Sequence, residues 1–268
     1  MSAAIEFREV SFAIPQGRLL LDKISLTLEE GTTTAILGRS GSGKTTLMRT
    51  VNRMIEYTSG EVFVHGKSNR SADLIQLRRS MGYVIQETGL FPHFTVERNV
   101  GLVPEIQGRP KSERQNHSRE LLTTVGLPPE TFAARYPHQL SGGQRQRVGL
   151  ARALAADPPI LLMDEPFGAL DPLTRAEMQD MLRTLLQHLH KTVLLVTHDL
   201  DEALYLAHRI VLLEEGKLIA NLTPHEFLNS PQPQVRSYIQ AFHRGERGNA
   251  GDPITACLPQ TKSNALTS

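Results

Sequence analysis

A glycine-rich segment near the start of the chain has the residue types and spacing of a phosphate-binding loop. It follows the pattern G-x-x-x-x-G-K-[ST] over the residues Gly38, Arg39, Ser40, Gly41, Ser42, Gly43, Lys44 and Thr45. Because glycine has no Cβ atom, such a loop can turn tightly and aim successive backbone N–H groups at one anion. The alternative interpretation is a flexible glycine turn that binds nothing.

The flanks of this loop favour phosphate binding. The apolar run 34–37 before it predicts a buried strand, and residues 45–51 after it predict a helix. Strand, loop and helix in this order indicate a nucleotide site, since the N-terminus of the helix attracts negative charge. Lys44 would then reach the β- and γ-phosphates and the Thr45 hydroxyl would ligate Mg²⁺. We include Thr46 among the residues expected to bind the nucleotide.

Two carboxylates follow a second apolar run much later in the chain. The run Ile160–Met163 is bounded by Asp157–Pro159 before it and by Asp164 and Glu165 after it. This pattern predicts a central parallel strand, and ligands of open α/β sheets bind at the carboxyl ends of such strands. Asp164 would hold Mg²⁺, while Glu165 would orient and deprotonate the attacking water. The alternative is a solvated acidic loop end without a chemical role.

One histidine is expected at the same edge of the sheet. His198 ends another β-rich run, residues 192–197, so it can hydrogen-bond a γ-phosphate held by the glycine-rich loop. A lone histidine is more often an ordinary surface or core residue, and the position at a strand end is what favours the functional interpretation here.

A third motif, Leu140–Gln144, is not needed to fold the phosphate site. Ser141 and Gln144 form a capping-box pattern at the start of a helix that we expect to reach about residue 156. Gly142 and Gly143 leave the backbone N–H groups at that helix start unshielded, which makes a second anion-binding terminus. Since the glycine-rich loop already covers the phosphates from one side, this terminus is expected to approach them from a second copy of the protein.

The elements between these motifs predict an α/β fold. We expect a P-loop NTPase core with a mainly parallel sheet, an N-terminal antiparallel β subdomain that begins with the strands Ile5–Val10 and Ile24–Leu28, and an inserted α-helical subdomain at about 90–156. Asp171 followed by Pro172 predicts the start of another helix. The ATPase domain is expected to occupy residues 1–230. Residues 231–268 would form a C-terminal extension that is disordered from about residue 244.

Composition narrows the class of protein. The net charge of +1 gives no electrostatic reason to expect nucleic acid as a partner. The apolar runs are shorter than the ~18 residues that a membrane-spanning helix needs, and the first residues lack the features of a signal peptide. A single cysteine, Cys257, excludes an internal disulfide and suits a reducing compartment.

With these motifs the sequence resembles the ATPase subunits of ABC transporters over residues 5–230. The resemblance implies a Walker A loop at 38–45, a Walker B aspartate at Asp164, a catalytic glutamate at Glu165 and a switch histidine at His198. It also implies three further site residues or segments: a Q-loop glutamine at Gln86 that contacts Mg²⁺ and takes part in catalysis, the family signature at 140–144, and a D-loop aspartate at Asp171. The cofactors would be ATP and Mg²⁺.

The same resemblance implies partners. Two ATPase subunits, identical or pseudo-symmetric, would pair head to tail about a two-fold axis and enclose two ATP molecules. They would lie at the cytoplasmic face of the membrane as peripheral subunits, dock on transmembrane permease subunits near Gln86 and residues 91–94, and depend indirectly on an extracytoplasmic solute-binding protein. The family usually has an aromatic residue that stacks on adenine, where this chain has Ile14; either Ile14 contacts the base or nearby Phe12 substitutes.

Several segments resemble importers of quaternary-amine osmoprotectants such as glycine betaine and choline: 52–53, 77–79, 89–93, 135–138 and 151–172. Many subunits of that group carry paired CBS domains, and the residues after 230 are too few to form them. An importer ATPase for an amino acid or another small polar solute is the alternative. A chromosome or DNA-repair ATPase of the same superfamily would need a long coiled-coil insertion, and no sustained heptads occur between Gln86 and Leu140.

Overall fold

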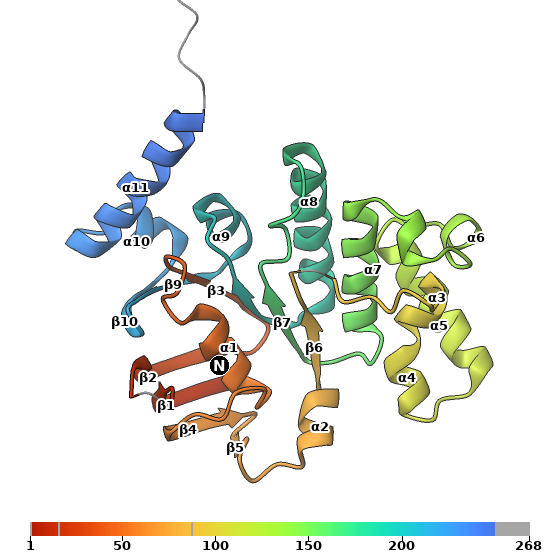
Figure 1. Cartoon of the computed structure of the whole chain (residues 1–268), viewed down its shortest axis with the longest axis horizontal. Helices are drawn as coiled ribbons and strands as arrows, with labels where there is room; N and C mark the ends of the chain where they lie inside the picture. The colour runs from red at the N-terminus through yellow and green to blue at the C-terminus, as the bar shows by residue number, and fades with distance from the viewer. Residues whose placement is uncertain (1, 16, 87, 250–268) are drawn as a thin grey trace, which may run out of the picture.

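The computed structural model describes residues 2–15, 17–86 and 88–249. It contains two β-sheets: one lies at the lower left of the view in Figure 1, and the other runs through the middle of the molecule with helices packed on it. The first sheet is antiparallel, in the order β2-β1-β4-β5. Its strands are β1 (Ala3–Ala13), β2 (Leu19–Glu29), β4 (Ser59–Val64) and β5 (Lys67–Ser68).

The second sheet has the order β10-β9-β3-β8-β7-β6, in which neighbouring strands from β9 to β6 are parallel and β10 pairs antiparallel with β9. Its strands are β3 (Thr33–Leu37), β6 (Met81–Val84), β7 (Ile160–Asp164), β8 (Thr192–Val196), β9 (Arg209–Glu214) and β10 (Lys217–Leu222). The strands β3, β7 and β8 are buried at every residue, as expected of parallel strands covered on both faces.

The helices between β6 and β7 gather in one part of the molecule (Figure 1). They are α3 (Val96–Val100), α4 (Leu102–Ile106), α5 (Lys111–Thr124), α6 (Pro129–Phe132) and α7 (Gly142–Leu154). The other helices are α1 (Lys44–Val51), α2 (Leu74–Arg79), α8 (Pro172–Leu189), α9 (Leu200–Leu206), α10 (Pro224–Leu228) and α11 (Pro233–Asn249).

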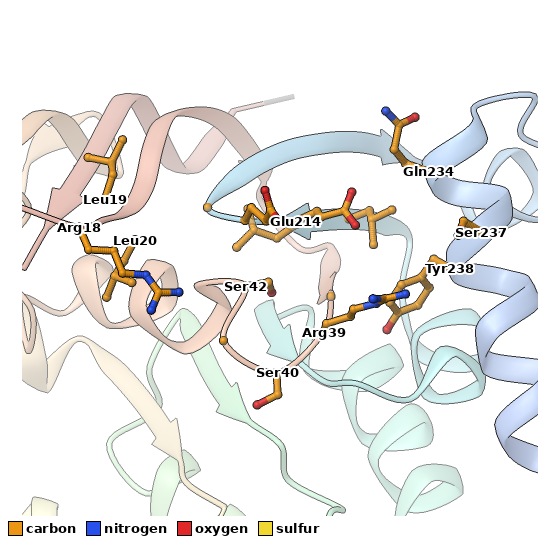
Figure 2. Close-up of a pocket in the computed structure, with 16 residues that line it drawn as sticks. Arg18, Leu19, Leu20, Arg39, Ser40, Ser42, Glu214, Gln234, Ser237 and Tyr238 are labelled. Atoms are coloured by element: carbon orange, nitrogen blue, oxygen red, sulfur yellow. The ribbon is translucent and has the colours of Figure 1, made fainter.

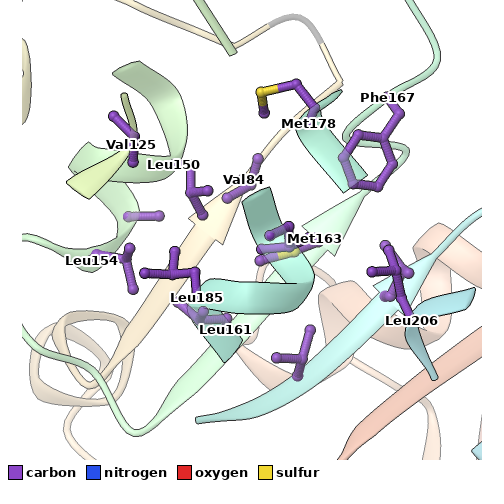
Figure 3. Close-up of a cluster of buried hydrophobic side chains, with 14 of the residues drawn as sticks. Val84, Val125, Leu150, Leu154, Leu161, Met163, Phe167, Met178, Leu185 and Leu206 are labelled. Carbon is purple, nitrogen blue, oxygen red and sulfur yellow. The ribbon is translucent and has the colours of Figure 1, made fainter. Parts of the chain in front are cut away.

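The parallel sheet separates two hydrophobic cores. Leu161 and Met163 of β7 point into the core that the helices on one face complete (Figure 3), whereas Ile160 and Leu162 point into the core shared with α1 and the antiparallel sheet. This division follows from the alternation of side chains along a strand. Both faces of β7 are therefore packed, and this packing fixes the position of Asp164 at the carboxyl end of the strand.

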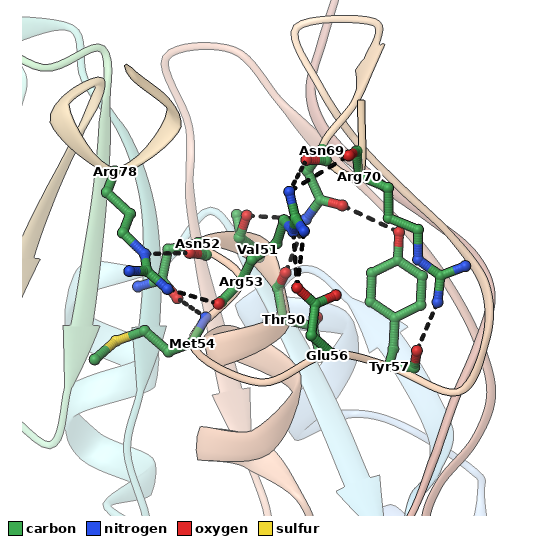
Figure 4. Close-up of polar contacts among 10 residues, drawn as sticks. All are labelled: Thr50, Val51, Asn52, Arg53, Met54, Glu56, Tyr57, Asn69, Arg70 and Arg78. Carbon is green, nitrogen blue, oxygen red and sulfur yellow. Dashed lines mark hydrogen bonds and ion pairs between the residues drawn. The ribbon is translucent and has the colours of Figure 1, made fainter. Parts of the chain in front are cut away.

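Helix α1 is fixed at its C-terminal end by a buried asparagine from a distant turn. The side-chain amide of Asn69 donates to the carbonyl oxygens of Thr50 (2.8 Å) and Val51 (3.1 Å) and accepts from the hydroxyl of Tyr57 (3.0 Å) (Figure 4). The guanidinium of Arg78 donates to the next carbonyl, that of Asn52, at 3.2 Å. These donors satisfy carbonyl groups that a helix end leaves without partners.

The first part of the C-terminal extension is helical. Helix α11 forms because apolar residues up to Phe242 recur on the side that packs against the rest of the molecule. Disorder from about residue 244 stays a prediction. The remainder of the predicted tail, with Cys257, lies outside the described residues. In the part of the chain that the structure describes, no helix has the length and apolar character needed to span a membrane.

Candidate functional site: a nucleotide site at the edge of the parallel sheet

The glycine-rich loop runs from the end of β3 to the first turn of α1. Gly43 caps α1 with φ of 101°, and a Cβ atom there would lie 2.7 Å from the carbonyl oxygen of Leu20, so both conformation and space require glycine. The ammonium group of Lys44 donates to the carbonyl oxygens of Gly38 (2.8 Å) and Arg39 (3.1 Å). Lys44 thus lies across the loop, where a phosphate held by the loop would meet its charge.

The residues around Lys44 change the pKa of its ammonium group. Burial lowers the pKa of the Lys44 ammonium, and the carboxylates of Glu165 and Asp164 act in the opposite direction. The two acids that sequence reasoning placed at the end of β7 therefore lie close enough to this lysine to act on it. The structure brings the two predicted phosphate-chemistry motifs into one site.

The oxygen atoms expected to hold a metal ion are adjacent. The hydroxyl of Thr45 donates to Oδ1 of Asp164 at 2.8 Å, although the two residues lie far apart in the sequence. Arg49 and the hydroxyl of Tyr83 each lie 3.5 Å from Oδ2 of the same, largely buried carboxylate. Mg²⁺ prefers oxygen ligands and usually takes one or two from the protein and the rest from phosphates and water. The donor set of Thr45 and Asp164 fits this ion.

Glu165 meets two of the other predicted residues. Its Oε2 atom lies 3.4 Å from Nε2 of Gln86 and 3.4 Å from Nδ1 of His198. The backbone N–H of Glu165 donates to the carbonyl oxygen of Val196 (2.9 Å), and its φ is 46°, which is uncommon for a residue with a side chain. The ends of β6, β7 and β8 thus bring an amide, a carboxylate and an imidazole together beside the phosphate loop.

The segment that carries His198 is supported by a buried acid. The hydroxyl of Thr197 donates to Oε2 of Glu202 at 2.6 Å, and the backbone N–H of Asp199 donates to that same hydroxyl at 3.0 Å. Asp199 in turn caps helix α9. Burial raises the pKa of Glu202 to about 7, although the hydrogen bond from Thr197 acts in the opposite direction.

The signature motif lies elsewhere in the molecule. Ser141 and Gln144 form the predicted capping box, with N···O distances of 3.2 and 3.0 Å, at the start of α7. A Cβ atom at Gly143 would lie 2.4 Å from Cγ2 of Thr174, so this glycine permits the close approach of α7 and α8. Ser141 and Gly142 are exposed, and α7 packs on α3, α5, β6 and α8, well apart from α1 (Figure 1). Within one molecule, therefore, this helix terminus faces solvent, and its binding of an anion stays a prediction.

Asp171, expected at a dimer seam, is exposed at the start of α8. Its carboxylate accepts the backbone N–H of Thr174 at 3.1 Å, and hydrogen bonds with Thr174 lower its pKa. The predicted helix start, an N-cap residue followed by proline, is confirmed. The cap describes what Asp171 does within one molecule, and a contact with a second molecule stays a prediction.

A cavity of about 530 Å³ borders the glycine-rich loop (Figure 2). Its walls are the loop itself, the start of β2, the β9–β10 turn and helix α11. The residues that line it are Arg18, Leu19, Leu20, Gly38, Arg39, Ser40, Gly41, Ser42, Leu212, Leu213, Glu214, Glu215, Gly216, Gln234, Ser237 and Tyr238. Ile14, the residue predicted to contact adenine, is half-buried in the turn before β2 and is not among them; its contact with a base stays a prediction.

Comparison with known proteins identifies the family. The family model described as "ABC transporter" matches residues 21–168. The chain belongs to the ABC transporter family. An ATP-binding cassette of this family, MJ0796, solved as a dimer in a post-hydrolysis state with ADP and Pi, superposes with a TM-score of 0.74 at 34% identity, covering 82% of this chain and 98% of that one. The structure of cbiO1 from Clostridium perfringens, described as part of the ABC transporter complex cbiONQ, gives a TM-score of 0.79 at 26% identity, covering 93% of this chain and 100% of that one.

Among curated members of the ABC transporter family, two relatives indicate a narrower group. The "Glycine betaine/carnitine/choline transport ATP-binding protein OpuCA" of Bacillus subtilis is 45% identical over 91% of this chain and 63% of its own length. The "Glycine betaine uptake system ATP-binding protein YehX" of Escherichia coli is 44% identical over 91% of this chain and 78% of its own length. The chain thus spans somewhat less than two thirds of the first of these relatives.

For this ABC transporter family member, sequence reasoning missed four residues around the site. Arg49 could have been found, because it follows Thr45 by four positions and so lies on the same face of α1. Tyr83, Glu202 and Tyr238 carry no local signal. Their roles depend on pairings between distant elements, which neither spacing nor periodicity reveals.

Proposed function

We propose that the protein is the ATP-hydrolysing motor subunit of an ABC importer. The observation that supports this most is the hydrogen bond between Thr45 and Asp164, because it joins the phosphate loop to the acidic strand end at the place where Mg·ATP would bind. Gln86 would add a third oxygen ligand from the end of β6. When bound, Mg²⁺ would neutralise charge on the β- and γ-phosphates.

The protein's own groups would do the remaining work. Lys44 and the loop N–H groups would hold the phosphates. Glu165 would orient the attacking water and accept its proton, and His198, whose Nδ1 atom lies 3.4 Å from that carboxylate, would donate to the γ-phosphate. The geometry suits an in-line attack whose barrier falls mainly through positioning and charge.

We further propose that two copies form the working unit. The N-terminus of α7 presents Ser141 and Gly142 to solvent, although its N–H groups are suited to an anion. In a head-to-tail dimer each of these termini would reach the γ-phosphate of the opposite copy, with Asp171 at the seam. ATP would then favour the closed pair more than ADP does, so hydrolysis would release it.

The solute would be a quaternary-amine osmoprotectant such as glycine betaine or choline. The transport roles in the names of the relatives support this proposal. The protein would act as a peripheral subunit at the cytoplasmic face of the membrane, bound to permease subunits and supplied by a solute-binding protein. An amino acid or another small polar solute is the alternative, since permease and binding protein choose the cargo.

One set of assays tests these proposals. ATP turnover should require Mg²⁺, should not respond to DNA, and should fall by roughly 10²–10⁴-fold in the Glu165→Gln variant. Light scattering of that variant with ATP should reveal a dimer, whereas with ADP it should reveal monomers. Turnover equal to the unaltered protein would contradict the role of Glu165, and ATP-bound monomers would contradict the shared site. Uptake of labelled glycine betaine by vesicles with the co-encoded permease tests the cargo.

A further inference from the structure

Helix α11 is anchored so that one aromatic residue faces the nucleotide site. Val235 is fully buried, and Ile239 and Phe242 pack against the core that lies on the helix-covered face of the parallel sheet. Tyr238, on the same side of the helix, packs there as well and reaches the cavity wall beside Arg39 (Figure 2). The direction of the tyrosine hydroxyl is therefore set by the packing of the whole helix.

The hydroxyl of Tyr238 lies between two segments of the site. It donates to the backbone carbonyl oxygen of His198 at 3.3 Å, and Tyr238 lines the same cavity as Gly38 and Arg39 of the phosphate loop. Burial raises the pKa of Tyr238 to about 12, with Asp199 acting in the same direction and Gly38 and Arg39 against it. The hydroxyl is thus protonated, and able to donate, throughout the neutral range.

The imidazole of His198 has few contacts of its own. Its ring is 62% exposed and lies 3.4 Å from Glu165, so surrounding side chains do little to hold it. The residue lies in the bend between β8 and α9, where the N–H of Thr197 donates to the Ile36 carbonyl oxygen at 3.2 Å on one side. The bond from Tyr238 fixes the following carbonyl group from the other side.

We propose that Tyr238 is a positioning residue for ATP hydrolysis: its hydroxyl holds the main chain of His198 so that the imidazole faces Glu165. This proposal rests on the proposed function. It assigns to the C-terminal helix a part in the chemistry, since the orientation of the histidine depends on α11 being in place.

The test is the Tyr238→Phe variant, which removes only the hydroxyl group, made in the full-length chain. Tyr205→Phe is the matched control, because its hydroxyl bonds the exposed Asp180 away from the nucleotide site. Both changes are also made together with His198→Ala. Single-turnover and steady-state ATP hydrolysis, ATP affinity and melting temperature are measured for each protein.

We expect Tyr238→Phe to lower kcat roughly two- to tenfold, the loss that corresponds to one hydrogen bond, with a smaller change in KM. In the His198→Ala background the same change should have less than a twofold effect, because the residue through which it acts is gone. Tyr205→Phe should leave both rates unchanged.

Two results would overturn the proposal: a kcat of Tyr238→Phe that equals or exceeds that of the unaltered protein, or an equal loss of rate in both backgrounds, which would indicate a general structural effect. A failure of the proposed function would look different. In that case His198→Ala and Glu165→Gln would themselves hydrolyse ATP at the normal rate.

Discussion

Replacing the buried acid Glu202 should change how the stability of the protein depends on pH. Glu202 is 3% exposed, and its carboxylate accepts a hydrogen bond from the hydroxyl of Thr197. Burial raises the pKa of Glu202 from the ordinary 4.5 to about 7. Between these values the folded state binds a proton that the unfolded state has lost, so this group makes the folded protein less stable as pH rises from 4.5 through 7.

The expected magnitude follows from the two values. At 1.36 kcal/mol for each pH unit by which they differ, Glu202 costs the folded protein about 3 kcal/mol at pH 8 and little below pH 4.5. In the Glu202→Gln variant the amide oxygen can still accept the hydrogen bond of Thr197, and no charge is buried at any pH. The variant should thus match the unaltered protein near pH 5 and exceed its free energy of unfolding by about 2–3 kcal/mol at pH 8.

Urea unfolding at pH 5, 6, 7 and 8 measures this difference. Glu113→Gln is the control, since this carboxylate on α5 has 57% of its side chain exposed and faces Arg109, whose charge does not change between pH 5 and 8. A difference between Glu202→Gln and the unaltered protein that stays constant over this range would refute the reasoning. So would a variant that loses stability relative to the unaltered protein as pH rises.

Three further changes test the elements around the site. Asn69→Ala should lower the free energy of unfolding by about 2 kcal/mol or more, because buried carbonyl groups lose their donor. Urea unfolding measures this loss, with the exposed Asn116→Ala as the control. Equal losses in the two variants would contradict the prediction. Thr45→Val should weaken Mg·ATP binding roughly ten- to hundredfold, while Mg²⁺-free ATP binds as before. Titrations of the variant with ATP, with and without EDTA, measure both affinities. Equal losses of affinity in the two titrations would refute a role of Thr45 in metal binding. Gly143→Ala should cost about 1–3 kcal/mol through contact with Thr174. Adding Thr174→Ser should recover part of the melting temperature, and no recovery would refute the clash.

The elements with local signatures were predictable from the sequence. The run Ile160–Met163 is a buried parallel strand, as predicted, because four apolar residues between breakers suit a strand covered on both faces. The capping box that begins at Ser141 and the N-cap at Asp171 are both present where the sequence patterns predicted them. The meeting of Thr45 and Asp164 followed from the rule that ligands gather at the carboxyl ends of parallel strands.

The remaining features could not be predicted, because they arise between segments that are distant in sequence. Asn69 reads as an ordinary turn residue until the antiparallel sheet places it against the end of α1. The packing of α11 is another such feature, because its apolar residues up to Phe242 contact a core built from strands and helices much earlier in the chain. Ile14 shows the same difficulty, since a departure from the family pattern does not tell which group takes over.

The hydrogen bonds at the C-terminal end of α1 have a consequence for how the nucleotide affinity of the site could change. The loop expected to receive the phosphates is continuous with α1, and the opposite end of this helix is held by hydrogen bonds from Asn69 and Arg78. Substitutions of Asn69 or Arg78 would raise or lower the nucleotide affinity of the loop, although neither residue would touch the ligand. Selection for tighter or weaker ATP binding can therefore act on residues at the C-terminal end of α1 and leave the phosphate loop and the carboxylates unchanged.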